Sequence, residues 1–203
     1  MIVFVEGPRN SGKTHLIDSF FKQNENPNVI YYKFKFAKYI EQFDLKDQEG
    51  GPGIHYFSIA NILTILELNK TFFKDKIIIF DRSIFSAYVW SIYRKRMDRT
   101  RLIEEFRKIL NSDLFEDCVL VYLTRDGKVE TSTRGKDYFC TFENYDAEKT
   151  IFEGVLKEFD TEISDESKGN TFVTFKNNFD EKSVVEFNTV MNDLIKARSS
   201  SNK

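Results

Sequence analysis

The sequence predicts an α/β fold in which helices cover both faces of a five-stranded parallel sheet. Two observations support this prediction. Five short apolar runs, each long enough for one strand, alternate with longer stretches whose apolar residues recur at helical spacing. A glycine-containing loop joins the first apolar run to the first helical stretch, as in the opening unit of such a sheet.

The predicted strands are nearly continuous runs of apolar and β-branched residues, as expected for buried parallel strands. They span residues 1–5, 29–34, 77–80, 119–123 and 171–175. Right-handed crossovers place the carboxyl ends of these strands at one edge of the sheet, where open α/β sheets bind their ligands.

Apolar residues at helical spacing predict the helices between these strands. The helix over 55–73 carries two apolar faces, which predicts burial on more than one side. Asp180 is expected to cap the last helix, and the Gly-Pro cluster in 44–53 predicts a loop. The first predicted helix includes residues 16–21, the next five span residues 37–43, 55–73, 83–95, 100–110 and 146–163, and the last follows Asp180 and includes residues 184–195.

The chain has 203 residues, of which 41% are hydrophobic, so it can form one domain with a substantial core. We expect this domain to span residues 1–198, with a mobile basic lid over about 124–142 and a flexible tail over 199–203. Cys118 and Cys140 lack metal-ligand spacing and are expected to be free thiols. With no apparent signal peptide and no run that could cross a bilayer, the sequence predicts a cytoplasmic protein without a membrane partner.

A phosphate-binding motif occupies the loop after the first predicted strand. Residues 7–14 read GPRNSGKT and match the P-loop pattern G-x-x-x-x-G-K-[ST] at every fixed position. The glycines let the main chain approach an anion, and successive N–H groups face one concavity at the positive end of the helix dipole. A chance glycine-rich turn is the alternative, but the flanking strand and helix argue against it. We therefore expect ATP and Mg²⁺ as cofactors, and nucleotide binding by Gly7, Pro8, Arg9, Asn10, Ser11, Gly12, Lys13 and Thr14.

Within this loop, Lys13 is a mobile cation for the β- and γ-phosphates and is expected to be catalytic. Thr14 offers its hydroxyl to Mg²⁺, and Asp81, which closes the third strand, is the expected second metal ligand. The alternative role for Asp81 is a cap for the following helix. Arg82 offers a rigid fork of donors suited to phosphate and is expected to be catalytic and to contact the substrate, whereas a structural ion pair is the alternative.

The glycine-punctuated segment after the fourth strand contains Arg125, Arg134 and Lys136. A basic lid would supply cations to the γ-phosphate and exclude water, although a solvated surface loop is the alternative. Arg134, beside Gly135, is the favoured catalytic residue, and Arg125 is expected to bind the nucleotide.

Further candidates are less specific. Arg94, Lys95, Arg96, Arg99 and Arg101 form a basic cluster that fits either a solvated helix end or a contact for a second anion or a polynucleotide. The net charge of −2 gives no whole-protein reason to expect nucleic-acid binding. Aromatic residues mostly belong to cores, but Phe36 and Tyr56 could line a base pocket for the substrate. The lone histidines, His15 and His55, receive no catalytic role.

Together these motifs resemble the thymidylate kinase and deoxynucleoside kinase group of P-loop kinases, and the order of elements is similar from end to end. The opening strand and loop resemble the family's, including Glu6 before the first glycine. The segment 80–86, FDRSIFS, resembles the Asp-Arg-aromatic-x-x-Ser motif of thymidylate kinases and the Glu-Arg-Ser motif of deoxynucleoside kinases. Residues 134–139, RGKDYF, are similar to the family's lid. The resemblance implies Mg²⁺-dependent transfer of the γ-phosphate of ATP.

The chain also departs from the family's pattern. Arg9 stands where thymidylate kinases usually have Asp, and residues 33–36 read KFKF where they have Arg-Glu-Pro. In deoxynucleoside kinases a carboxylate near the end of the second strand resembles a general base, but here that place holds Lys33 and Lys35. An acceptor that is already an anion needs cations more than a base, which favours a nucleoside monophosphate.

The leading hypothesis is therefore a nucleoside monophosphate kinase whose partner is a small nucleotide. The alternatives are a deoxynucleoside or other small-molecule kinase, a polynucleotide 5′-kinase that uses the basic cluster, and a P-loop NTPase switch without phosphotransfer. Two apolar helix faces could also form a homodimer, although nothing in the sequence requires one.

Overall fold

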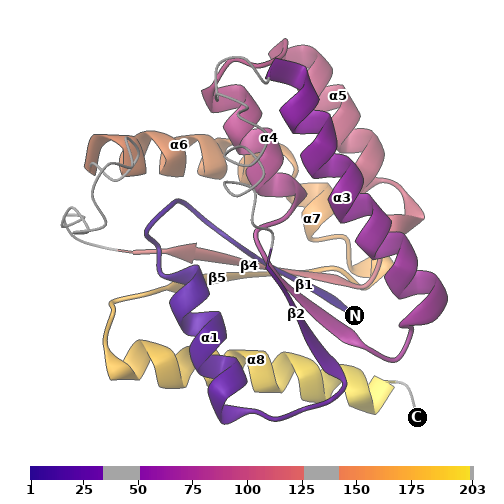
Figure 1. Cartoon of the computed structure of the whole chain (residues 1–203), viewed down its shortest axis with the longest axis vertical. Helices are drawn as coiled ribbons and strands as arrows, with labels where there is room; N and C mark the ends of the chain where they lie inside the picture. Colours follow the sequence, from indigo (N-terminus) through magenta and orange to yellow (C-terminus); the bar gives the residue numbers. More distant parts are fainter. Residues whose placement is uncertain (34–50, 126–141, 202–203) are drawn as a thin grey trace.

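The computed structural model describes residues 1–33, 51–125 and 142–201. Its five strands form one parallel sheet in the order β2-β3-β1-β4-β5 (Figure 1). This confirms the predicted α/β class and the parallel sheet. The strands are β1 (Ile2–Glu6), β2 (Val29–Lys33), β3 (Ile77–Asp81), β4 (Cys118–Thr124) and β5 (Thr171–Lys176).

The strand ends lie in register at one edge of the sheet. Val5 and Lys33 both pair with Asp81, and Glu6 pairs with Tyr122. The P-loop, which follows Glu6 directly, therefore begins beside the end of β3, as the parallel arrangement predicts.

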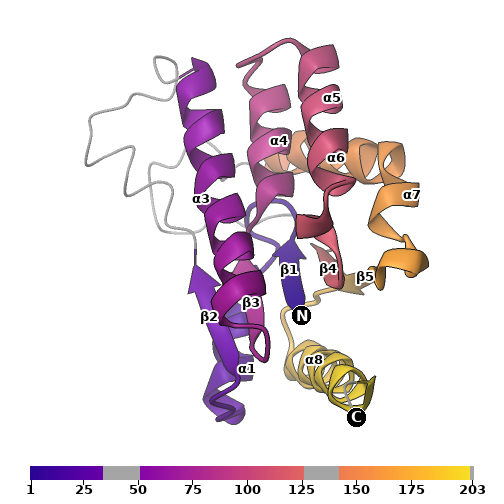
Figure 2. The ribbon, with the colours of Figure 1, turned by 90° about the vertical axis from the view of Figure 1, so that its right-hand side faces the viewer.

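Helices cover both faces of this sheet. Figure 1 shows α1 (Lys13–Gln23) and α8 (Glu181–Ser201) on one face and the remaining helices on the other. On that second face α3, α4 and α5 lie side by side (Figure 2). The second layer contains α3 (Gly51–Phe72), α4 (Ile84–Tyr93), α5 (Arg99–Leu110), α6 (Phe142–Glu158) and α7 (Asp160–Ile163), and short 3₁₀ turns span Asp113–Phe115 and Glu166–Lys168.

Alternating residues of the strands supply two cores, one on each face. Phe4 and Phe80 face the α3–α7 layer, where their rings contact each other. Val5 and Ile79 face α1 and α8. The central strands are buried on both faces, which explains why their sequences are continuously apolar.

Several element boundaries differ from the prediction. Helix α3 begins at Gly51, inside the segment expected to be a loop, because a proline in the first turn lacks only an N–H that has no helical partner. The second apolar face of α3 is buried only in part: Ile65 packs against the core, whereas Phe72 is 76% exposed. The predicted helix over 146–163 is two helices, α6 and α7, separated at Phe159, whose φ of −115° is not helical.

The last helix is capped as predicted, since the Asp180 carboxylate accepts a hydrogen bond from the Ser183 N–H at 2.7 Å. This helix runs on to Ser201 and so includes part of the expected tail. Cys118 is a buried free thiol. The expected helix over 37–43, Cys140 and most of the expected lid lie outside the described residues. Among the helices that are described, we find none that could span a lipid bilayer.

Candidate active site

The P-loop connects the end of β1 to the start of α1 through a backbone that only glycine tolerates at two points. Gly7 has a φ of 140° and Gly12 a φ of 85°. A side chain at Gly7 would overlap the carbonyl oxygen of Leu123, and one at Gly12 would overlap the Asn177 side chain. Asn177 also anchors the loop, because its amide donates to the Ser11 carbonyl at 2.9 Å. Leu123 on β4 and Asn177, which directly follows β5, therefore fix the position of the loop.

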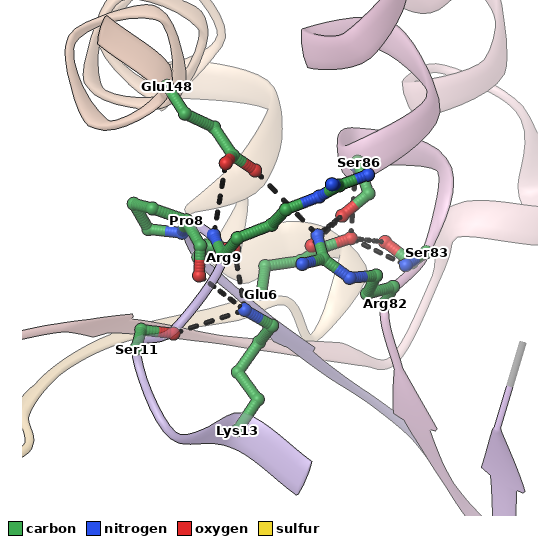
Figure 3. Close-up of polar contacts among 10 residues, drawn as sticks. Glu6, Pro8, Arg9, Ser11, Lys13, Arg82, Ser83, Ser86 and Glu148 are labelled. Atoms are coloured by element: carbon green, nitrogen blue, oxygen red, sulfur yellow. Dashed lines mark hydrogen bonds and ion pairs between the residues drawn. The ribbon is translucent and has the colours of Figure 1, made fainter. Parts of the chain in front are cut away.

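Lys13 lies buried against the loop that precedes it (Figure 3). Its ammonium donates to the carbonyls of Gly7 and Pro8, each at 2.7 Å, and to the Ser11 hydroxyl at 3.1 Å. Burial, followed by the nearby Arg82 cation, lowers the pKa of Lys13 to about 7. An anion placed beside this ammonium would favour its charged form, so the site is built to gain from phosphate binding.

The two expected metal ligands are in direct contact. The Thr14 hydroxyl donates to Asp81 Oδ2 at 2.5 Å, and the Tyr31 hydroxyl donates to the same oxygen at 3.3 Å. Burial first, and then the Asp81 charge, raise the pKa of Tyr31, which keeps it a hydrogen-bond donor. One hydroxyl and one carboxylate fit Mg²⁺, which commonly takes few protein oxygens and completes its shell with phosphate and water. The described residues contain no cluster of three His, Cys, Asp or Glu side chains that could hold a metal by themselves.

Arg82 follows Asp81 in a left-handed backbone conformation, with a φ of 76°. Its N–H donates to the Val5 carbonyl at 3.2 Å, continuing the β1–β3 pairing by one residue. Its guanidinium donates to Ser86 Oγ at 3.1 Å and lies 3.9 Å from Glu148 Oε1 (Figure 3). Such backbone strain is concentrated at functional sites, and here it directs a cation towards the P-loop lysine.

Glu6 organises this region, although the sequence analysis gave it no role beyond the resemblance. Its fully buried carboxylate accepts hydrogen bonds from the peptide N–H and hydroxyl of Ser83, both at 2.6 Å. It also accepts from the N–H of Ser86 at 3.2 Å and from its hydroxyl at 2.6 Å. The signal in the sequence was an acidic residue that closes an otherwise apolar strand.

Glu148 on α6 was missed by the sequence analysis altogether. Its side chain is 5% exposed, and Oε2 accepts a hydrogen bond from the Arg9 N–H at 3.1 Å. Since the other oxygen pairs with Arg82, one buried carboxylate joins the P-loop to the segment after β3 (Figure 3). Nothing in the sequence around Glu148 distinguishes it from the other acidic residues of its helix.

Arg125, expected to bind nucleotide, lies at the end of β4 between two aromatic rings. Its guanidinium carbon is 5.4 Å from the Tyr145 ring centroid and 5.1 Å from that of Phe179. Phe179 in turn lies against Gly12, so Arg125 stands near the start of α1. Burial lowers the pKa of Arg125.

Among the remaining candidates that the structure describes, Tyr56 and part of the basic cluster make polar contacts with α5 and α6. The Tyr56 hydroxyl donates to Glu105 at 3.0 Å and accepts from Arg101 at 2.9 Å, so its contacts are with α5. Arg101 also pairs with Glu105 at 3.0 Å, and Arg99 pairs with Glu158 at 3.2 Å, which favours a solvated helix end for this part of the basic cluster. Arg134, Lys136 and Phe36 lie outside the described residues.

Comparison with known proteins identifies solved structures with a similar fold. Neither a protein-family model nor a curated protein matches the chain. Among solved structures, deoxyadenosine kinase from M. mycoides, with the products dCMP and dCDP, has a TM-score of 0.61 at 18% identity, covering 97% of this chain and 100% of its own. Thymidylate kinase from Ehrlichia chaffeensis has a TM-score of 0.57 at 16% identity, covering 95% of this chain and 98% of its own. The NadR protein in complex with NR has a TM-score of 0.61 at 16% identity, covering 96% of this chain.

The chain spans 49% of the length of NadR but nearly all of the two kinases. At these identities the likeness shows the fold alone, which this chain shares with the deoxyadenosine kinase and the thymidylate kinase. The P-loop and the FDRSIFS segment predicted a likeness to thymidylate kinases and deoxynucleoside kinases, and the comparison confirms this likeness in the fold.

Proposed function

We propose that this protein is a kinase that transfers the γ-phosphate of ATP to a nucleoside monophosphate. The contact that carries the proposal is the one between Thr14 and Asp81, because it joins the P-loop to the end of β3 at the point where Lys13 and Arg82 also converge. Phosphoryl transfer requires a loop that binds phosphate, oxygen ligands for Mg²⁺, and cations near the transferred group. The P-loop, the two oxygens of Thr14 and Asp81, and the side chains of Lys13 and Arg82 would meet these requirements.

In the proposed reaction the P-loop amides and Lys13 bind the β- and γ-phosphates of the donor. The three hydrogen bonds that Lys13 makes to its own loop are exchanged for bonds to phosphate oxygens. Thr14 and Asp81 would hold Mg²⁺, which would neutralise charge on the donor phosphates. An oxygen of the acceptor phosphate attacks the γ-phosphorus in line, and the bond from that phosphorus to the β,γ-bridging oxygen breaks. ADP and a nucleoside diphosphate leave, while Arg82, with Arg134 as the lid candidate, stabilises the charge on the phosphoryl group in transfer.

The donor base has a candidate site beside the loop. Arg125 and Phe179 offer a cation and an aromatic ring next to Gly12, a combination suited to stacking on a purine. The proposed acceptor-base residues are Phe36 and Tyr56. A cytoplasmic location and a homodimer stay predictions.

The test is an acceptor screen with Mg-ATP that follows ADP release, with each nucleoside monophosphate and each nucleoside supplied in turn. We expect at least one monophosphate to stimulate ADP release above the rate without acceptor, and Lys13→Ala to abolish the stimulation. Stimulation by nucleosides alone would establish the second candidate, a nucleoside kinase, which the likeness to deoxyadenosine kinase favours. Slow hydrolysis without any acceptor dependence would instead indicate an NTPase, and the proposed function would be wrong.

A further inference from the structure

Arg9 departs from the pattern of the family that the chain resembles, and its side chain leaves the phosphate-binding loop. The guanidinium carbon of Arg9 lies 4.1 Å from the ring centroid of Trp90, which lies on α4 one turn beyond Ser86. Figure 3 shows the side chain extending from the loop towards α4. A residue counted among the donor ligands from its place in the motif therefore presents its charge to a different element.

Arg9 therefore contacts the same face of α4 as Arg82, whose guanidinium donates a hydrogen bond to Ser86. Ser86 and Trp90 are four residues apart on α4 and therefore lie one turn apart on a single helix face. Arg82 donates to Ser86 at the first turn, and Arg9 covers Trp90 one turn further on. Two guanidinium groups from separate elements thus approach one surface within about 6 Å of helix rise.

Glu148 fixes the relation between these two arginines. Its carboxylate accepts the Arg9 N–H at 3.1 Å through one oxygen and pairs with Arg82 at 3.9 Å through the other. Glu148 is buried, and its hydrogen bond fixes the position of the Arg9 main chain. The Arg9 side chain is thereby directed away from the loop amides around Lys13. Lys13 therefore lies beside the loop that would bind the donor phosphates, whereas Arg9 and Arg82 contact the face of α4.

We propose that Arg9 determines acceptor specificity: with Arg82 it forms an anion site on the α4 face that binds the phosphate of the nucleoside monophosphate. This inference rests on the proposed function and assigns the monophosphate to named side chains. Guanidinium groups bind phosphate through paired, charge-assisted hydrogen bonds, and a nucleoside without phosphate cannot use them. Arg9 thereby contributes to selecting a monophosphate over a nucleoside, while Lys13 and the loop amides serve ATP.

Trp90 provides a direct readout, because it is the single tryptophan of the chain and lies under the Arg9 guanidinium. The experiment titrates the full chain with each nucleoside monophosphate, without ATP, and follows tryptophan fluorescence. Mg-ATP affinity is measured separately by calorimetry. The variants are Arg9→Gln and Arg82→Gln, and the matched control is Arg107→Gln, whose ion pair with Glu162 joins α5 to α7. Thermal unfolding followed by circular dichroism checks that each variant folds.

We expect Arg9→Gln and Arg82→Gln each to weaken monophosphate binding about 10-fold or more, since each removes a charge-assisted contact. Arg9→Gln should leave Mg-ATP affinity within about twofold of the wild type, and Arg107→Gln should change neither affinity. If Arg9→Gln binds the monophosphate as tightly as the wild type, the inference is wrong while the proposed function stands. If the wild-type chain binds nucleosides but no monophosphate, both are wrong.

Discussion

The Glu6 carboxylate and the peptide N–H of Ser83 meet at 2.6 Å, and this contact ties the end of β1 to the start of α4. With the Ser83 hydroxyl and both donors of Ser86, Glu6 accepts four hydrogen bonds while fully buried. The carboxylate thereby fixes the turn that carries Arg82. Removing its charge would leave buried donors poorly paired, which is costly.

Glu6→Gln should therefore lower the free energy of unfolding by about 2–4 kcal/mol, because the new amide can accept fewer hydrogen bonds and brings donors of its own. Urea unfolding followed by circular dichroism measures this. The control is Glu153→Gln on α6, an exposed residue paired with Lys149, which should change stability by less than about 0.5 kcal/mol. Equal stabilities for the two variants would show that Glu6 does not organise this turn.

Magnesium dependence should follow the contact between Thr14 and Asp81. In Thr14→Val the hydroxyl is lost, and we expect the Mg²⁺ concentration needed for half-maximal turnover to rise about 10-fold, with Thr14→Ser restoring most of the loss. Initial rates at fixed ATP over a range of Mg²⁺ concentrations measure the effect. An unchanged Mg²⁺ requirement in Thr14→Val would remove this residue from the proposed metal site.

Lys95 lies two residues beyond the end of α4 and has a left-handed conformation with a φ of 50°. The hydrogen bonds around it form the pattern that usually places glycine there: Lys95 N–H donates to Ile92 at 3.1 Å and Arg96 N–H donates to Ser91 at 3.0 Å. Since the Lys95 side chain is exposed, Lys95→Gly should stabilise the protein by about 0.5–1 kcal/mol, or roughly 1–4 °C in melting temperature. Lys95→Ala keeps the Cβ and should give no such gain in a calorimetric melt.

Acid should destabilise the protein through His55. Burial is the main reason that its pKa lies below the usual value near 6.5, with Arg96 adding to the shift while Glu105 and a backbone contact at Ala87 oppose it. Between pH 6.5 and the folded-state pKa, the unfolded chain binds a proton that the folded chain does not, so stability falls as the pH drops.

His55→Gln should therefore flatten the decline in unfolding free energy between pH 7.5 and 5.5, whatever its effect at pH 7.5. His15→Gln is the matched control, because His15 is exposed on α1 and is the other histidine of the chain. Denaturant titrations at several pH values supply the comparison. A wild-type slope retained in His55→Gln would exclude this histidine as its source.

The sequence was most informative where local chemistry decides the structure. The glycines of residues 7–14, the apolar strands and the order Asp81-Arg82 predicted the loop, the sheet and the edge at which they meet, because each depends on nearby residues or on strand handedness. The start of α3 was predicted too late, since Gly51, Pro52 and Gly53 were interpreted as a loop although the first helical turn tolerates them.

Contacts between distant segments could not be predicted in the same way. Glu6 meets Ser83 across 77 positions, and Glu148 meets Arg9 across 139, so neither pairing leaves a spacing that a single sequence reveals. The direction of the Arg9 side chain is equally a product of tertiary structure. A motif identifies a residue's backbone position, but the surrounding helices decide what its side chain contacts.

The central claim is that residues 7–14 bind the phosphates of a magnesium nucleotide, and calorimetric titration of the chain with Mg-ATP tests it most directly. We predict saturable binding by the wild type that Lys13→Ala weakens about 10-fold or more, while the variant keeps the circular dichroism spectrum and unfolding midpoint of a folded protein. An absence of binding by the folded wild type, or equal affinity in Lys13→Ala, would contradict the account.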